Sequence, residues 1–230
     1  MEKKNLRIAL GLPMVGDLKA EVVGQLLALV GEMKDICSPA ICVVNDLFPY
    51  DRARNRLVEL ALECNCDYLL FVDADTQVNV GSFTRLLKEA LKTEAVITCG
   101  NILKRGFPFS SPWSLVKEGK CFNVEGTEDC EESIDIDACG FPFTLVDLEF
   151  IKEEIEKPWF KMYQYLGKDG KIATQWEDSF FCAEVKKKQG RIIGVPKATC
   201  GHVWGRVVIE ESNALELRQK HLKTLKRKDD

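Results

Sequence analysis

The chain has 230 residues, of which 46% are hydrophobic, and its formal net charge is −4. This size is sufficient for one domain with a substantial core and two sub-lobes. The lack of a basic excess argues against a nucleic-acid partner. No apolar run approaches the roughly 18 residues of a transmembrane helix, and the N-terminus lacks the apolar core and cleavage site of a secretory signal. We therefore expect a cytoplasmic protein.

Strands and helices alternate over the first hundred residues. Predicted strands cover residues 6–12, 40–44, 68–72 and 95–99, and predicted helices cover residues 18–33, 52–63 and 82–91. The strands are short unbroken apolar runs, whereas the helices carry apolar residues three or four positions apart. Asp51 is the expected N-cap of the second helix. This alternation predicts a Rossmann-like, mostly parallel sheet with right-handed connections.

The pattern changes after Gly100, where prolines, glycines and acidic residues become frequent. We expect a hairpin over residues 113–123, a strand over 134–138, an apolar segment over 139–146, a helix over 147–155 capped by Asp147, irregular structure over 158–165, a helix over 177–188, a strand over 191–195, a strand or loop over 200–205, and a helical tail from residue 207. The whole is expected to be a three-layer α/β/α domain with a small antiparallel subsheet and a C-terminal helix.

Ten cysteines are scattered along the chain without any Cys-x-x-Cys pair. This spacing does not support a zinc-finger or thioredoxin-type motif. In a reducing compartment most of them would be small buried hydrophobic residues. A disulfide, as found in intracellular proteins of hyperthermophiles, stays open as an alternative.

Two acids one residue apart follow the third predicted strand. Asp73 and Asp75 lie at the carboxyl end of that strand, where open α/β sheets place their ligands. Side chains at positions i and i+2 of an extended chain point the same way. Their oxygens suit a hard divalent cation that keeps open positions for phosphate oxygens. An isolated Asp-x-Asp can equally be a solvated acidic turn, so other segments must support the assignment.

Seven segments in a fixed order resemble the GT-A glycosyltransferases, specifically the family-2-like group that uses nucleotide-sugar donors. They comprise residues 8–13, 53–55, 68–75, 96–104, 137–145, 176–178 and 201–203. The resemblance covers about residues 6–205. It implies a single GT-A domain, in which residues 1–100 bind the nucleotide-sugar, residues 101–205 form the acceptor and catalytic half, and residues 206–230 form a helical tail.

The resemblance also implies which residues bind the donor. Pro13, Asn45 and Asp46 would enclose the base and ribose, Arg54 would face the nucleotide, and Gly140 would line the sugar and acceptor pocket. The alternative for Arg54 is an ordinary surface arginine. The turn at Asn45 and Asp46 departs from the acid-rich turn of common members, so the identity of the base stays open.

A metal site is a further implication of the resemblance. Asp73 and Asp75 would hold Mn²⁺ or Mg²⁺ against the diphosphate of the donor, and His202 would complete the site. The ion would neutralise charge on the leaving nucleoside diphosphate. An imidazole ligand favours Mn²⁺ over Mg²⁺. The alternative for His202 is a hydrogen-bonded structural histidine.

Glu177 and Asp178 are the implied catalytic pair. By the resemblance, Asp178 takes the proton from the acceptor hydroxyl in an inverting transfer. The alternative is an ordinary helix start, because acids in a first turn favour the helix dipole. Trp113, Trp159 and Trp176 are candidate platforms for a sugar face, or alternatively core residues.

We therefore expect a metal-dependent glycosyltransferase that moves a hexosyl group from a UDP- or GDP-sugar to a saccharide or a lipid-linked acceptor. A sugar-1-phosphate nucleotidyltransferase is one alternative, although residues 13–17 lack its glycine-rich basic loop. A non-catalytic nucleotide-sugar or carbohydrate-binding module is another. The basic cluster at residues 223–228 suits peripheral contact with the inner face of a membrane, and its alternative is a solvated helix.

Overall fold

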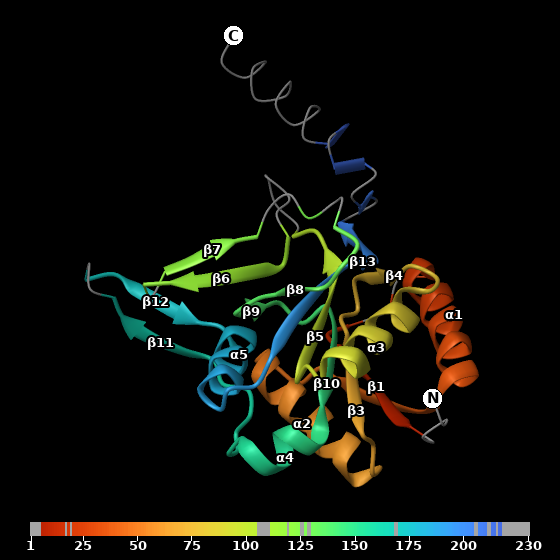
Figure 1. Cartoon of the computed structure of the whole chain (residues 1–230), viewed down its shortest axis with the longest axis horizontal. Coiled ribbons are helices and arrows are strands. Elements are labelled where there is room, and N and C mark those ends of the chain that lie inside the picture. Colours follow the sequence, from red (N-terminus) through yellow and green to blue (C-terminus); the bar gives the residue numbers. More distant parts are fainter. Residues whose placement is uncertain are drawn as a thin grey trace.

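The computed structural model describes residues 6–16, 18, 20–104, 111–118, 120–124, 127, 130–167, 170–204, 207–210, 213–214 and 216–217. A nine-stranded mixed sheet forms its centre, and helices cover both faces of that sheet (Figure 1). Within this described part of the chain, no helix is long and apolar enough to cross a membrane.

Five helices are described. They are α1 (Ala20–Ile36), α2 (Tyr50–Glu63), α3 (Ser82–Thr93), α4 (Leu148–Glu154) and α5 (Glu177–Lys187). The strands are β1 (Arg7–Met14), β2 (Ser38–Asn45), β3 (Tyr68–Val72), β4 (Thr76–Val78), β5 (Ile97–Ile102), β6 (Trp113–Lys117), β7 (Lys120–Asn123), β8 (Ile134–Asp135), β9 (Ala138–Cys139), β10 (Phe143–Asp147), β11 (Tyr163–Leu166), β12 (Ile172–Gln175), β13 (Ile192–Trp204) and β14 (Val207–Ile209).

The central sheet has the strand order β14-β13-β5-β10-β3-β1-β2, and β4 and β8 pair with β13 outside this path. β1 runs parallel to β2 and β3, and β13 runs parallel to β5. β10 lies antiparallel between β3 and β5. The expected mostly parallel core is confirmed, with β10 as an antiparallel strand inside it.

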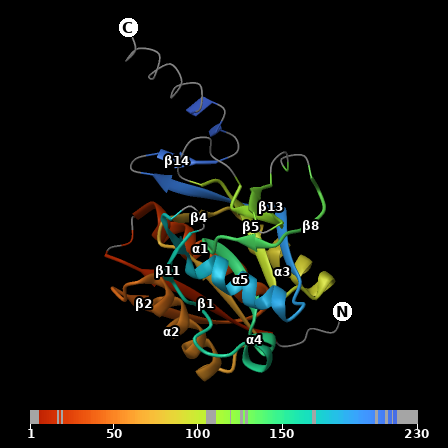
Figure 2. The same ribbon diagram turned by 90° about the vertical axis from the view of Figure 1, so that its left-hand side faces the viewer.

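Two hydrophobic cores lie on opposite faces of the sheet. Ala9 and Leu69 face the core beneath α2, α4 and α5, whereas Ile8 and Leu70 face the core beneath α1 and α3. This alternation follows from the two-residue repeat of strand side chains. Figure 2 shows α5 and α2 in front of the sheet and α3 behind it. The predicted three-layer α/β/α architecture is confirmed.

Two hairpins extend the domain on the side away from α1 (Figure 1). The predicted hairpin over residues 113–123 is confirmed as β6 and β7, and β9 joins it in a three-stranded antiparallel sheet. Residues 158–162 are irregular as predicted, but residues 163–165, which were also predicted to be irregular, belong to β11, which pairs with β12 in a second hairpin. The prediction was wrong for residues 163–165 because the strand pairing of β11 depends on residues 172–175, which carry little apolar alternation.

Three other predicted elements differ from the observed ones. The single strand predicted over residues 134–138 is split, because β8 pairs with β13 whereas β9 pairs with β6. The segments predicted separately over 191–195 and 200–205 belong to one long strand, β13, with a register shift between Val195 and Thr199. The tail does not begin as a helix, since β14 pairs with the end of β13. The basic cluster at 223–228 lies outside the described residues.

The two predicted helix caps have different outcomes. Asp147 caps α4, since its carboxylate accepts a hydrogen bond from the Phe150 backbone N–H at 3.1 Å. Asp51 is not the N-cap of α2, because that helix already begins at Tyr50 after Pro49. The Asp51 carboxylate instead accepts from the Met162 backbone N–H at 3.1 Å, and so ties the first turn of α2 to the approach to β11.

All ten cysteines are free thiols, and six of them are buried. Their expected role as small hydrophobic residues is therefore confirmed for the majority. Burial raises the pKa of Cys200 well above its ordinary value, which keeps this thiol neutral.

Candidate active site

A cavity of about 600 Å³ opens at the carboxyl ends of β1, β3 and β5, below the start of α5. Eight of the residues predicted to act in the site line it: Pro13, Arg54, Asp73, Asp75, Gly140, Glu177, Asp178 and His202. These residues come from six separate stretches of sequence, and the fold brings them to one place. The carboxyl ends of the strands are the usual ligand site of an open α/β sheet.

Asn45 and Asp46 do not line this cavity. The Asp46 carboxylate accepts hydrogen bonds from the Gly16 backbone N–H at 3.0 Å and from the Asn45 side-chain amide at 3.1 Å. The two residues therefore hold the loop after β1 against the end of β2. Tyr50 lines the cavity near this loop and was not predicted from the sequence.

Asp75 and His202 meet because β4 pairs antiparallel with β13. His202 lies opposite Thr76 in this ladder, and the Val203 backbone N–H donates to the Asp75 carbonyl at 2.8 Å. The His202 Nε2 atom is consequently 3.5 Å from Asp75 Oδ2. After its register shift between Val195 and Thr199, β13 still pairs with β5 at Thr199 and Cys200, and β4 pairs with β13 from Cys200 to His202.

The second ring nitrogen of His202 determines what Nε2 can do. Nδ1 lies 2.9 Å from the Leu103 carbonyl oxygen, which can only accept a hydrogen bond. Nδ1 therefore carries a proton, and in the neutral ring Nε2 presents its lone pair to the Asp75 carboxylate. Two acceptors at this distance attract each other only if a proton or another cation joins them.

These two groups fit a divalent metal better than the predicted set of three does. Carboxylate oxygen with imidazole nitrogen is a donor set suited to Mn²⁺, and a carbonyl partner for the distal ring nitrogen is typical of metal-binding histidines. Asp73 is turned toward Arg54 instead. Across the described residues, no group of three His, Cys, Asp or Glu side chains is close enough to hold an ion. The chain itself thus offers two convergent donors, Asp75 and His202.

Arg54 is a buried residue, so its surface alternative is wrong. Only 4% of it is exposed, and its guanidinium carbon lies 5.3 Å from the ring centre of Phe71 and 5.5 Å from that of Phe141. Its Nη2 is 3.3 Å from Asp73 Oδ1, and its Nε is 3.2 Å from Glu177 Oε1. Burial opposes the charge of Arg54, but the neighbouring carboxylates outweigh it and raise the pKa of the guanidinium.

Asp73 occupies the floor of the cavity at the end of β3. Its backbone N–H donates to the Pro142 carbonyl at 3.0 Å, which joins the end of β3 to the chain entering β10. Removal from solvent raises the pKa of its carboxyl group to about 6, against the lowering effect of Arg54, and repulsion from Asp75 and Glu177 adds to the increase. The fold therefore gathers more negative charge here than Arg54 alone compensates.

Glu177 and Asp178 are adjacent in sequence but differ in environment. Glu177 is 6% exposed and is directed to Arg54. Asp178 Oδ1 accepts from the backbone N–H of Ser179 at 2.6 Å and from its hydroxyl at 3.2 Å. Its Oδ2 atom lies beside Gly140, 3.8 Å from the point where a β-carbon on that glycine would stand. Burial and then the charge of Glu177 raise the pKa of Asp178, which suits proton transfer nearer neutral pH.

The three tryptophans predicted as candidate platforms for a sugar differ in their exposure to solvent. Trp113 and Trp159 are buried, and the Trp113 indole N–H donates to the Gly100 carbonyl at 3.3 Å. Trp176 is 57% exposed and lines the cavity immediately before Glu177. Lys104, which the sequence did not single out, also lines the cavity, and its ammonium donates to the Asn123 side-chain oxygen at 3.2 Å.

Part of the chain is similar in sequence to a known family. Residues 48–149 match the sequence model of the family described as Glycosyl transferase family 2. This segment runs from two residues before α2 through Asp73 and Asp75 to the start of α4. A search of curated protein sequences finds no match to the chain.

Two solved structures show the same fold. Protein A197 from STIV is 17% identical with a TM-score of 0.62, and the alignment covers 90% of this chain and 91% of that one. GalNAc-T7, solved with UDP, GalNAc and Mn²⁺, is 12% identical with a TM-score of 0.54. That alignment covers 88% of this chain but only 45% of GalNAc-T7. The chain therefore has a GT-A fold, and residues 48–149 within it are similar to glycosyltransferase family 2.

Proposed function

We propose that the chain is a metal-dependent glycosyltransferase that moves a hexosyl group from a nucleoside-diphosphate sugar to an acceptor hydroxyl with inversion. One observation carries the proposal. Within a single cavity, Asp75 and His202 converge on one side, while Asp178 presents a carboxylate oxygen beside Gly140 on another. The family 2 match over residues 48–149 supports the same activity.

The donor half of the proposal rests on Asp75 and His202. Both would hold Mn²⁺, or Mg²⁺ less favourably, and the metal when bound would neutralise charge on the leaving diphosphate. The presence of UDP and Mn²⁺ in the GalNAc-T7 structure supports UDP as the nucleotide, with GDP as the other candidate. Pro13 and Tyr50, which line the cavity near the end of β1, would contact the nucleoside.

Asp178 would act as the general base. An inverting transfer is a displacement in which the acceptor oxygen attacks from the face opposite the leaving diphosphate, so a carboxylate is needed on that face. Asp178 Oδ2 would accept the hydroxyl proton as the new bond forms. Glu177 would position it, because its ion pair with Arg54 fixes the first turn of α5.

A panel of nucleotides tests the donor half directly. We expect UDP or GDP, but not the corresponding nucleoside, to raise the melting temperature when Mn²⁺ is present, since a ligand that binds only the native state stabilises it. Asp75→Asn should remove the effect of Mn²⁺, whereas Asp35→Asn on α1 should not. A shift that is equal with Mn²⁺ and with a chelator would contradict the metal-dependent proposal.

A further inference from the structure

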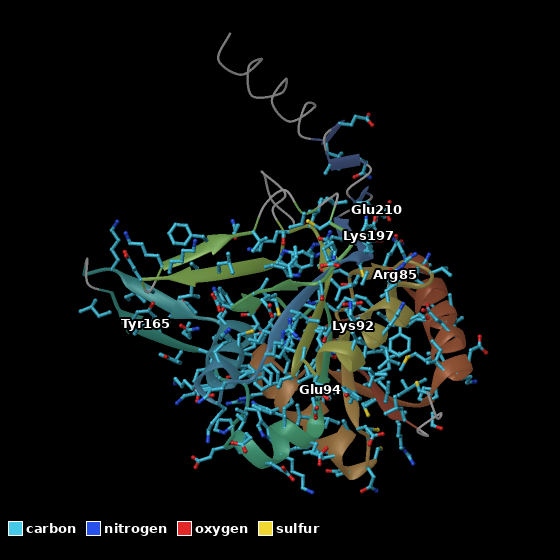
Figure 3. The ribbon with its side chains drawn as sticks, viewed as in Figure 1. Arg85, Lys92, Glu94, Tyr165, Lys197 and Glu210 are labelled. Carbon is cyan, nitrogen blue, oxygen red and sulfur yellow. The ribbon has the colours of Figure 1, made fainter. Side chains whose placement is uncertain are left out.

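The β11–β12 hairpin exposes apolar and aromatic side chains on both of its faces. Leu166 and Ile172 form a cross-strand pair at its outer end and are 72% and 73% exposed. On the other face, Tyr163 and Tyr165 are 42% and 48% exposed, with ring centres 6.2 Å apart. Figures 1 and 3 show the hairpin, with Tyr165, projecting away from the sheet and from α1.

This arrangement is unfavourable for a hairpin surrounded by water. Isolated two-stranded ribbons are marginally stable, and a solvated strand normally places polar side chains on its outer face. All four residues of β11 are exposed instead. A surface that combines large aliphatic and aromatic groups in this way indicates contact with another phase or molecule.

The charge of the same segment indicates which contact is favoured. Residues 161–172 contain Lys161, Lys168 and Lys171 against a single acid, Asp169, although the whole chain has a net charge of −4. The Lys161 ammonium lies 5.8 Å from the ring centre of Tyr163. Lysine, tyrosine and aliphatic residues together are the composition of segments that bind anionic membrane interfaces.

We propose that this hairpin docks the protein on an anionic lipid bilayer. Leu166 and Ile172 enter the boundary of the acyl chains, the two tyrosines lie at headgroup depth, and Lys161 contacts anionic headgroups. A bilayer covers both faces of a projecting hairpin at once. A bound saccharide would cover the tyrosine face alone and would leave Leu166 and Ile172 in water.

The position of the hairpin relative to the cavity gives this docking a consequence. β12 leads directly to Trp176, which lines the cavity. Four strand residues span roughly 13 Å, so the docked hairpin would hold the cavity close to the membrane surface. A lipid-linked acceptor could then reach Asp178 without leaving the bilayer. The docking itself does not depend on the proposed function, because vesicle binding needs neither donor nor turnover.

Cosedimentation with vesicles tests the inference on the full-length chain. We expect binding to mixed phosphatidylcholine–phosphatidylglycerol vesicles, weaker binding at high salt, and little binding to phosphatidylcholine alone. The L166S/I172S double variant should reduce the bound fraction by about fivefold or more, because it removes the apolar anchor. L27S/V80S is the matched control, since Leu27 and Val80 are 70% and 82% exposed but lie on α1 and before α3.

The outcomes separate the alternatives. Both double variants should fold as the parent does, because all four side chains are exposed, and circular dichroism checks this. Loss of binding in L166S/I172S alone supports the docking surface. Binding equal to that of the parent, or equal loss in both variants, overturns it. The oligomeric state of each protein is also measured without vesicles. If L166S/I172S has a different oligomeric state from the parent, the hairpin contacts a second copy of the chain, and this result would also overturn the proposal.

Discussion

Arg54 Nε lies 3.2 Å from Glu177 Oε1, across 123 residues of sequence, and both side chains are buried. The same guanidinium contacts Asp73 at the end of β3. Arg54 therefore joins the strand that carries the Asp-x-Asp motif to the helix that carries Asp178. The two adjacent acids therefore differ in role, because Glu177 forms this ion pair whereas Asp178 does not.

The Arg54–Glu177 pair predicts a large effect on stability. Arg54→Met should lower the free energy of unfolding by about 3–5 kcal/mol, because it leaves the buried Glu177 carboxylate without its partner. Adding Glu177→Gln should cost less than the sum of the single effects, since the two residues interact directly. Urea denaturation of the four proteins of this cycle measures both quantities.

Arg56→Met provides the matched control for that cycle. Arg56 lies two residues after Arg54 in α2 and pairs with Glu59 and Glu63 on the surface. Exposed pairs contribute little, so this variant should unfold at nearly the parental urea concentration. If Arg54→Met and Arg56→Met lowered the free energy of unfolding by the same small amount, the contacts of Arg54 would not stabilise the packing of α5 against the end of β3.

Removing His202 should weaken metal-dependent binding without unfolding the chain. His202→Ala removes one of two proposed donors, so we expect weaker UDP binding with Mn²⁺ and unchanged, weak binding with a chelator. Isothermal titration calorimetry under both conditions measures the difference. An unfolded variant, or one with full Mn²⁺ dependence, would assign His202 a structural role through its hydrogen bond to the Leu103 carbonyl.

The pH dependence of kcat/KM should report the ionisation of Asp178. Because burial and Glu177 raise the pKa of this acid, activity should be complete at high pH and fall as pH drops through a value above that of an ordinary aspartate. Glu177→Gln removes a negative neighbour and should move the fall to lower pH. If the fall of kcat/KM at low pH occurs at the same pH in Glu177→Gln as in the parent, it does not report the ionisation of Asp178.

Gly140 should limit the space beside the proposed base. A β-carbon there would meet Pro142 Cδ at 3.5 Å and Asp178 Oδ2 at 3.8 Å, which are ordinary contacts, so Gly140→Ala should fold normally. The methyl group would occupy the approach to Asp178, and we expect slower turnover with unchanged donor affinity. Gly24→Ala in α1, where nothing lies within 4 Å, should leave turnover unchanged. Equal activities would remove Gly140 from the acceptor pocket.

Local patterns were sufficient to predict the sheet and much of the cavity. The apolar runs before Pro13 and Asp73 mark strands whose carboxyl ends line the site, and the helix at Glu177 begins as predicted. The partners of these residues could not be predicted. Nothing near Arg54 in sequence indicates that Glu177 will meet it, because that contact is made only when α2 and α5 pack on the same face.

The edges of the fold were the least predictable part. β11 is an exposed strand whose pairing with β12 gives no buried alternation, so the hydrophobic pattern did not identify it. β13 read as two segments because its register shift near Val195 interrupts the apolar run. The pairing of β4 with the second part of this strand brings His202 close to Asp75, and the sequence pattern did not identify β4 as a strand.

The anomeric configuration of the product, followed by NMR for the parent and for Asp178→Asn, tests the central proposal most directly. Asparagine keeps the shape of the side chain and removes the proton acceptor. We expect an inverted product from the parent and a loss in turnover of about 10² to 10⁴ in the variant, with donor affinity nearly unchanged. A product of retained configuration, or an Asp178→Asn protein that turns over within a few-fold of the parent, would contradict the assignment of Asp178 as the base.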